Sequence, residues 1–182
     1  HKELLLCAKG FDLDVVVRDS ATSYAVSLSE TTFSEYLASL SGSTRLKLFN
    51  KRKRLVQLGR IEVRNVWPNI NGFIEVLNGF HLQRWGKACY EGRNRKLITD
   101  FLHNISSEGG EVDLSILYQN EKPISAVLDV ACQQRIYNIQ SGYLEKFNDG
   151  ISLGTLHFGY QIEKAFTSPA LFYDFMAGEV EK

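Results

Sequence analysis

The residues best suited to bind an anion lie at positions 150–155, where glycines and small hydroxyl side chains precede a segment with helical character. Ser152 suits the N-cap of a helix that continues to Phe166. The first backbone N–H groups of a helix have no partner within it, and they lie at the positive end of its dipole. We therefore predict a site for a phosphate or pyrophosphate on the backbone of Gly150, Ser152, Leu153, Gly154 and Thr155.

Two further candidates share one predicted helix. His81 and Arg84 are three residues apart and lie on the same face, with Trp85 beside them. A histidine with an ordinary pKa near 6.5 could act as a general base at neutral pH. The alternative is a histidine on the helix surface that packs beside the tryptophan.

Asp174 and Tyr143 complete the candidate catalytic residues. Asp174 is the one charge in the apolar run 171–176. A carboxylate there must be paired or hydrogen-bonded, or its pKa must rise. Tyr143 ends the strand before the glycine loop, where its hydroxyl could donate a proton to a leaving group. The alternatives are a position at the sheet edge for Asp174 and a packing role for Tyr143.

Other common sites are not predicted. The sequence has no Gly-x-Ser-x-Gly, no Walker loop and no His-Glu-x-x-His. Its histidines are scattered and its three cysteines are far apart without a Cys-x-x-Cys, so we predict neither a metal site nor a disulfide framework: His1, His81, His103, His157, Cys7, Cys89 and Cys132.

Composition bounds the class of protein. Of the 182 residues, 44% are hydrophobic and 23% are charged, which is typical of a globular protein. The formal net charge is zero, so the chain as a whole does not favour a nucleic-acid partner. No apolar run reaches the roughly 18 residues of a membrane span, and the first residues show no signal-peptide pattern. We expect no membrane insertion and a cytoplasmic location.

The basic residues are concentrated in one segment. Residues 44–59 are predicted to form a single helix that ends at Gly59. One face carries its positive charges: Arg45, Lys47, Lys51, Arg52, Lys53 and Arg54. That face could contact the phosphates of a cofactor or of a nucleic acid. The alternative is a solvated face on a helix that packs through its leucines.

The elements that would position these residues alternate in a recognisable order. From residue 61 the hydrophobic periodicity predicts strands at 61–67, 111–118, 123–132, 135–143 and 171–176, with helices at 69–86, 95–105 and 152–166. Before them we predict the end of a helix at 2–9, strands at 14–18 and 24–28, and a helix at 32–40. Helices followed by a meander and a crossover indicate an α/β (α+β) layered domain.

This order resembles the core of the GNAT N-acyltransferases. Within that superfamily the chain looks like the CelD/BcsL group, which is associated with cellulose and exopolysaccharide biosynthesis and related to Fem peptidyl transferases. The resemblance rests on four motifs: Phe33-Ser-Glu-Tyr-Leu-Ala-Ser-Leu40 with the basic run after it, His81-Leu-Gln-Arg84-Trp85, Ile162-Glu163-Lys-Ala165, and Tyr173-Asp174-Phe175-Met176-Ala-Gly178.

The resemblance implies a GNAT-like mixed, mostly antiparallel sheet flanked by helices. It implies that acetyl-CoA or another acyl-CoA is a co-substrate, with its pyrophosphate on the loop 150–155 and its pantetheine between the strands 135–143 and 171–176. The amine or hydroxyl of a small-molecule or saccharide acceptor would attack the thioester directly. The superfamily's Q/R-x-x-G-x-G/A loop is reproduced here only in part.

Two other functions fit the same resemblance. A Fem-like transferase would use aminoacyl-tRNA, and the basic helix would then contact RNA. A non-catalytic module of a polysaccharide-synthesis complex would keep the fold alone. We expect residues 1–59 to be the tail of a preceding GNAT-like half plus the linking basic helix, and residues 60–182 to be the core, cut short at its C-terminus. The sequence leaves the oligomeric state open.

Overall fold

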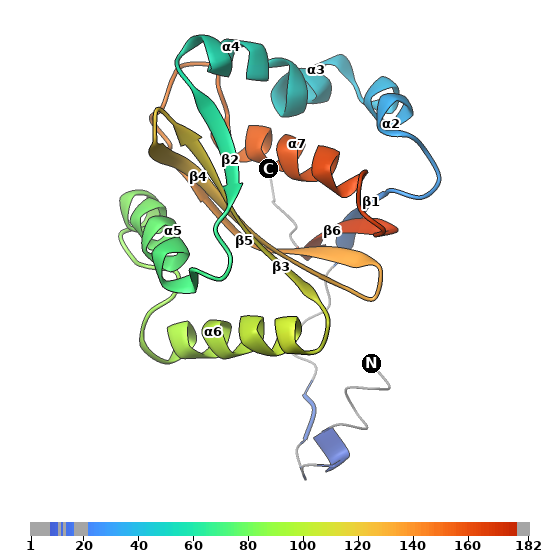
Figure 1. Cartoon of the computed structure of the whole chain (residues 1–182), viewed down its shortest axis with the longest axis vertical. Coiled ribbons are helices and arrows are strands. Elements are labelled where there is room, and N and C mark those ends of the chain that lie inside the picture. The colour runs from blue at the N-terminus through green and yellow to red at the C-terminus, as the bar shows by residue number, and fades with distance from the viewer. Residues whose placement is uncertain (1–7, 11, 13, 17–21, 178–182) are drawn as a thin grey trace.

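The computed structural model describes residues 8–10, 12, 14–16 and 22–177. Its described part contains one six-stranded sheet, in the order β1-β6-β5-β4-β3-β2, with helices on both faces (Figure 1). The strands are β1 Ser23–Ser27, β2 Ile61–Asn65, β3 Glu111–Gln119, β4 Lys122–Cys132, β5 Arg135–Tyr143 and β6 Phe172–Ala177. Among these neighbouring pairs only β5–β6 is parallel. The predicted mixed, mostly antiparallel sheet is confirmed.

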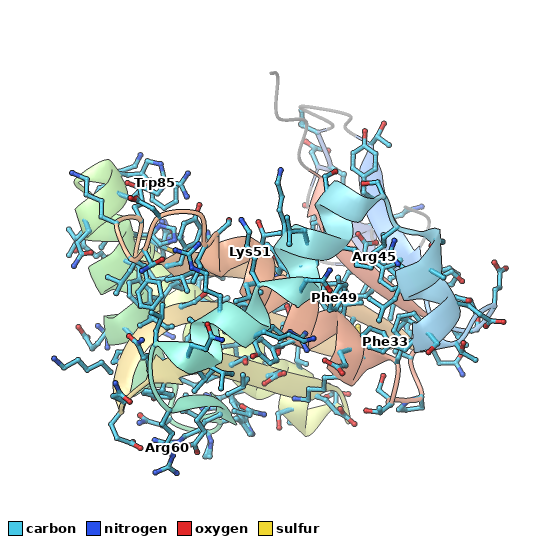
Figure 2. The ribbon with its side chains drawn as sticks, turned by 90° about the horizontal axis from the view of Figure 1, so that it is seen from above. Phe33, Arg45, Phe49, Lys51, Arg60 and Trp85 are labelled. Carbon is cyan, nitrogen blue, oxygen red and sulfur yellow. The ribbon has the colours of Figure 1, made fainter. Side chains whose placement is uncertain are left out.

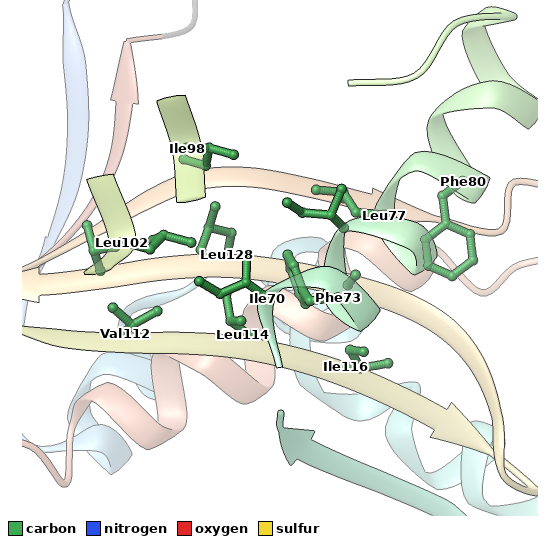
Figure 3. Packing of buried hydrophobic residues seen from close by; sticks show 13 residues of the cluster. Ile70, Phe73, Leu77, Phe80, Ile98, Leu102, Val112, Leu114, Ile116 and Leu128 are labelled. Carbon is green, nitrogen blue, oxygen red and sulfur yellow. The ribbon is translucent and has the colours of Figure 1, made fainter. Parts of the chain in front are cut away.

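Helices α5 (Ile70–Trp85) and α6 (Gly92–Ser107) cover one face of the sheet. The amide oxygen of Asn69 accepts from the Gly72 N–H and caps α5, which ends at Gly86 in a left-handed conformation. Apolar residues of the two helices, Phe73, Leu77 and Leu102, pack on Leu114 of β3 and Leu128 of β4 (Figure 3). Burying each such side chain stabilises the fold by about 1.5–3 kcal/mol.

Helix α7 (Leu153–Ala165) covers the opposite face, and a broken basic segment lies over it (Figure 1). The single helix predicted for residues 44–59 is wrong. The segment divides into α3 (Gly42–Arg45), the π-helical turn η1 (Leu46–Asn50) and α4 (Arg52–Gln57). A Cβ on Gly159 of α7 would lie 2.0 Å from the Leu48 carbonyl oxygen, so the π-helical turn packs directly against the α7 backbone.

Strands β5 and β6 diverge beyond a short contact. They pair in parallel only from Arg135–Phe172 to Tyr137–Asp174. In the β4–β5 ladder, Asp129 is opposite Asn138 and Leu128 is opposite Gln140, which leaves Ile139 as the extra residue of a β-bulge. The two strands therefore separate just where β5 bulges, and α7 begins beyond the open end.

Several predicted boundaries change. Residues 14–16 carry no regular structure, so a strand there is wrong, and Val17 and Arg18 lie outside the described residues. Helix α6 begins at Gly92 instead of residue 95. The strand at 24–28 and the helix at 32–40 are confirmed as β1 and α2 (Phe33–Ser39). Residues 8–10 are helical, while residues 1–7 and Gly178 lie outside the described part.

Candidate functional site

The N-terminus of α7 is fixed by apolar anchors on either side of Ser152. Ile151 and Leu153 are both buried, and they pack in one cluster with Leu117 of β3 and Leu55 of α4. Because these two side chains are buried, only their backbone groups are available to a ligand. Ser152 occupies the N-cap position, but its side chain makes no capping bond; its Oγ lies 3.0 Å from the Thr155 Oγ1. The first-turn N–H groups of α7 are thus left without a side-chain cap.

Basic side chains of the segment above α7 reach this helix end. Lys51 Nζ donates a hydrogen bond to the Gly150 carbonyl, and Figure 2 shows Lys51 on the segment that crosses over α7. The Arg54 guanidinium lies 3.5 Å from where a Cβ on Gly150 would stand, and Gly150 has a φ of +80°. Cations beside the positive end of a helix are unfavourable. An anion placed there would be attracted by the two cations and by the positive end of the helix.

Tyr143 and Arg84 adjoin the same helix end. The ring of Tyr143 lies against Gly154, where a Cβ would be 2.6 Å from the ring. Arg84 donates to the Tyr143 hydroxyl at 2.7 Å and forms an ion pair with Glu145 at 2.9 Å. Its guanidinium also lies over the Trp85 ring, 4.5 Å from the centroid. The structure therefore brings Arg84, Tyr143 and Gly154 together.

His81 lies behind this group, on the α5 face of the sheet. It is 8% exposed, and its Nε2 donates to the Ser141 carbonyl of β5 at 3.0 Å. Its ring centroid is 4.5 Å from that of Trp85. The imidazole therefore supports the end of β5 and is covered by the tryptophan, an arrangement close to the packing alternative.

Asp174 stands apart from the other candidates. It is in register with Tyr137, six residues along β5 from Tyr143, which is roughly 20 Å at the rise of a strand. Asp174 is 6% exposed, and its carboxylate forms an ion pair with Arg135 at 2.8 Å and accepts from the Met176 N–H at 2.8 Å. These contacts give it the paired environment that a buried carboxylate requires.

A second polar cluster lies beneath the C-terminal half of α7 and was missed in the sequence. Asp129 of β4 is 2% exposed and accepts hydrogen bonds from Asn138, Gln161 and Tyr173, at 2.8–2.9 Å. Burial raises the pKa of Asp129 to about 6. Asp174 was selected in the sequence because it is a single charge within an apolar strand. Asp129 is also a single charge within an apolar strand, so the same criterion could have found this cluster.

His157 is the other buried titratable group beneath α7. It is fully buried, and its two ring nitrogens lie 3.0 Å from the hydroxyls of Ser115 and Ser125. Burial lowers the pKa of His157 to about 3, so the imidazole is neutral at physiological pH. These two hydrogen bonds tie α7 to β3 and β4. Sequence spacing gave no indication of it, because its three members come from three elements.

Within the described part of the chain, no group of three or more His, Cys, Asp or Glu side chains is placed to hold a metal ion. None of its helices combines the length and the apolar character needed to cross a membrane. Cys89 and Cys132 are free thiols.

The fold is similar to those of two solved structures. FemX is 14% identical, with a TM-score of 0.64 over 99% of this chain and 61% of its own. L-PGS from Bacillus licheniformis is 15% identical, with a TM-score of 0.57 over 88% of this chain and 46% of its own. This chain thus spans less than two thirds of either structure. No curated protein is significantly similar in sequence.

The sequence itself matches one family. The model of the acetyltransferase (GNAT) domain covers residues 42–181, from α3 to beyond β6. That span is most of the chain, and it includes the diverging strands, α7 and the basic segment described above. The chain therefore belongs to the acetyltransferase (GNAT) domain family, and its domain is that of an acyltransferase.

Proposed function

We propose that the chain transfers an acyl group from acyl-CoA, with acetyl-CoA as the first candidate, to a nitrogen or oxygen of a sugar or polysaccharide precursor. One observation carries the proposal: β5 and β6 pair over three residues and then diverge, and α7 begins at the open end beside Lys51 and Arg54. The pantetheine would lie between the strands. The pyrophosphate would bind the backbone at Gly150, Ser152, Leu153, Gly154 and Thr155.

The residues around this helix end suit binding of the donor, whose thioester would be attacked directly further along the strands. The ring of Tyr143 lies against Gly154, and because its hydroxyl accepts from Arg84, its own proton is free for an oxygen of the pyrophosphate. Arg84 would add a positive charge beside the same group. His81 would hold the end of β5 in place through the Ser141 carbonyl. Asp174 would not touch the reacting atoms; its ion pair with Arg135 would hold β6 against β5.

The nature of the acceptor rests on the CelD/BcsL resemblance in the sequence motifs. Those motifs include His81 and Arg84 of α5, and Arg84 donates to the Tyr143 hydroxyl. A saccharide acceptor would bring hydroxyl or amino groups that need hydrogen-bonding partners. Arg84 and Glu145 offer such partners beside the site, because their side chains are 33% and 49% exposed.

Titration calorimetry with acetyl-CoA tests this proposal. We expect heat of binding that CoA abolishes by competition and that weakens as salt is added. The Lys51→Ala/Arg54→Ala double variant should bind more weakly. Lys47→Ala/Lys53→Ala removes the same charge from exposed positions of the same segment and should bind like the wild type. Absence of heat and of competition by CoA would refute an acyl-CoA donor.

A Fem-like function is the second candidate, because FemX aligns with 99% of this chain. The resemblance to Fem transferases implies an aminoacyl-tRNA donor, whose phosphates would meet the basic segment. In that case tRNA binding should fall steeply with salt, and a Lys51→Ala/Lys53→Ala/Arg54→Ala variant should lose it. Binding of acetyl-CoA without tRNA affinity would reject this candidate. Acetyl-CoA binding without turnover would support the non-catalytic module instead.

A further inference from the structure

Large apolar side chains are exposed where α5 ends and where α6 follows it. Leu82 and Trp85 of α5 are each 50% exposed, and Leu97 of α6 is 68% exposed. Phe101 comes four residues after Leu97, so it lies on the same side of α6, and it is exposed as well. Single exposed apolar side chains are ordinary in proteins, but a group of them on one surface indicates a partner.

Asn78 connects the exposed residues of the two helices. Leu82 and Trp85 come four and seven residues after Asn78, so all three lie on one side of α5. The amide oxygen of Asn78 accepts from the N–H groups of Cys89 and Tyr90, and its nitrogen donates to the Tyr90 carbonyl, at 2.9–3.1 Å. The connection to α6 therefore runs along this side of α5, which ends at Trp85 (Figure 2).

Tyr90 also belongs to a surface groove on α6. The groove is lined by Tyr90, Asn94, Leu97, Ile98 and Phe101. Asn94 is the one side chain among them with a hydrogen-bonding amide, so the groove is mainly apolar. The exposed residues of α5 and the groove on α6 thus adjoin through Tyr90. We refer to Leu82, Trp85, Tyr90, Leu97 and Phe101 as the α5–α6 apolar surface.

Positive charge borders this surface. The segment from Leu82 to Phe101 contains five basic residues, Arg84, Lys87, Arg93, Arg95 and Lys96, against the acidic Glu91 and Asp100. Three of the basic residues are paired with the carboxylates of Glu145, Glu75 and Asp100. Lys87 and Arg93 are exposed, and neither forms an ion pair with any residue that the structure describes. Their charges are therefore available to a partner.

This combination disfavours a second copy of the chain as the partner. A two-fold contact places one surface against itself, so Lys87 and Arg93 would face the same cations of the other copy. Like charges that meet across an interface weaken association. A nucleic acid would attract the cations, but it offers no apolar phase for Leu82 and Leu97.

A lipid bilayer with anionic headgroups matches both features. Leucine and phenylalanine side chains are stabilised at the boundary of the acyl chains, and tryptophan and tyrosine favour the level of the headgroups. Lysine and arginine near the surface are attracted to anionic lipids. Each kind of side chain on the α5–α6 apolar surface and its border therefore has a counterpart in one bilayer surface.

We propose that the α5–α6 apolar surface docks the chain on an anionic bilayer without crossing it. Leu97 and Phe101 enter the acyl boundary, and Lys87 and Arg93 contact lipid phosphates. The Arg84 guanidinium lies over the Trp85 ring and donates to the Tyr143 hydroxyl, so docking brings the bilayer to the edge of the candidate site. The docking does not depend on the proposed acyl transfer.

Co-sedimentation with vesicles tests the apolar contribution. We expect the wild type to bind vesicles of equal parts phosphatidylglycerol and phosphatidylcholine, and to bind pure phosphatidylcholine more weakly. Leu97→Asp should weaken binding to the mixed vesicles by about 10- to 100-fold. Val56→Asp makes the same change at an equally exposed position of α4, over the opposite face of the sheet, and should bind like the wild type. Equal binding by the two variants overturns the proposal.

A second pair of variants tests the charge and does not rely on the folding of Leu97→Asp. Lys87→Ala/Arg93→Ala should weaken binding to the mixed vesicles about tenfold. Lys47→Ala/Lys53→Ala removes the same charge from exposed positions of the basic segment and should leave the binding unchanged. The reverse result would place the bilayer on the basic segment and refute docking through α5 and α6.

Trp85 reports the depth of docking. Lipids brominated on their acyl chains should quench the fluorescence of the wild type, and the quenching should disappear in Trp85→Phe, which retains only Trp67. Absence of quenching in the wild type contradicts contact with the bilayer. Sedimentation velocity without lipid examines the other partner: a dimer of the wild type that Leu97→Asp dissociates would assign the surface to a second copy instead.

Discussion

The two ends of α7 differ in charge, and each carries charge of the same sign as its end of the helix dipole. Lys51 and Arg54 lie beside the positive N-terminal end. Glu111, Asp113 and Asp129 lie beneath the negative C-terminal half, where only Lys164 opposes them. Neither arrangement is favourable for the chain alone. A phosphate at the first end would relieve the repulsion there, whereas at the second end Lys164 already pairs with Asp113.

The two ends are also held by different forces. Apolar packing of Ile151 and Leu153 fixes the first, whereas hydrogen bonds to the buried Asp129 fix the second. The stability contributed by apolar packing does not depend on pH, but the contribution of a buried carboxylate does. We therefore expect the C-terminal half to respond to pH and the N-terminal end to respond to steric changes and to salt.

The largest effect is expected from Gly159→Ala, which would separate the basic segment from α7. The new Cβ would lie 2.0 Å from the Leu48 carbonyl oxygen, which is backbone and cannot rotate away. We expect the free energy of unfolding to fall by about 4 kcal/mol in chemical denaturation. The cations would then no longer be fixed over the helix N-terminus, and acetyl-CoA affinity should fall as well.

Gly79→Ala in α5 is the matched control for that change. Gly79 is also within a helix, and a Cβ there would meet nothing within 4 Å. It should stabilise the fold by about 0.4–1 kcal/mol, since alanine restricts the unfolded chain. Equal stability of the two variants would show that the contact between the π-helical turn and α7 is not tight.

The second effect is a pH dependence that distinguishes the C-terminal half. The pKa of Asp129 is raised from 3.8 to about 6, so folding favours its protonated form. The stability that it contributes is present below pH 4 and is lost as pH rises through 6. Relative to Asp129→Asn, the wild type should therefore gain about 2 kcal/mol between pH 7 and pH 4. Denaturation at both pH values measures the difference.

His157 should show the opposite sign. Its pKa is lowered from 6.5 to about 3, so its contribution is present above pH 6.5 and is lost as pH falls. Relative to His157→Gln, the wild type should lose about 3 kcal/mol over the same interval. The contributions of the two groups oppose each other in the wild type, so the single variants are needed to separate them. Parallel profiles for both variants would contradict this assignment.

The sequence predicted the strands and helices from β2 to β6 because their periodicity is local. It failed at 44–59, where helical spacing is continuous but Gly159, more than a hundred residues away, receives Leu48 in a π-helical turn. The anion site at residues 150–155, before and at the start of α7, was predicted from the glycines there and from their position ahead of a helix. The polar cluster around Asp129 was not, because Asp129, Gln161 and Tyr173 come from three elements and meet only in the fold. The division at residue 59/60 stays a prediction.

A third, smaller effect is expected at the N-terminal end from Gly154→Ala. The Cβ would lie 2.6 Å from the Tyr143 ring, and this side chain can move where a backbone could not. We expect a loss of about 1–2 kcal/mol in stability and a displaced Arg84–Tyr143 pair. Tyr143→Leu in the same chain should restore most of that stability. A double-mutant cycle with no coupling between the two positions would show that they do not touch.

The smallest effect is expected from charge at the same end. Lys51→Ala/Arg54→Ala should weaken acetyl-CoA binding by about 1 kcal/mol, or roughly fivefold, since exposed charges at a helix end contribute about 0.3–1 kcal/mol each. Without ligand the same variant should be as stable as the wild type or slightly more so, because it removes cations from the positive end of α7. Added salt should erase the difference in binding. A variant that loses stability but keeps its affinity would show that Lys51 serves the fold through the Gly150 carbonyl rather than the ligand.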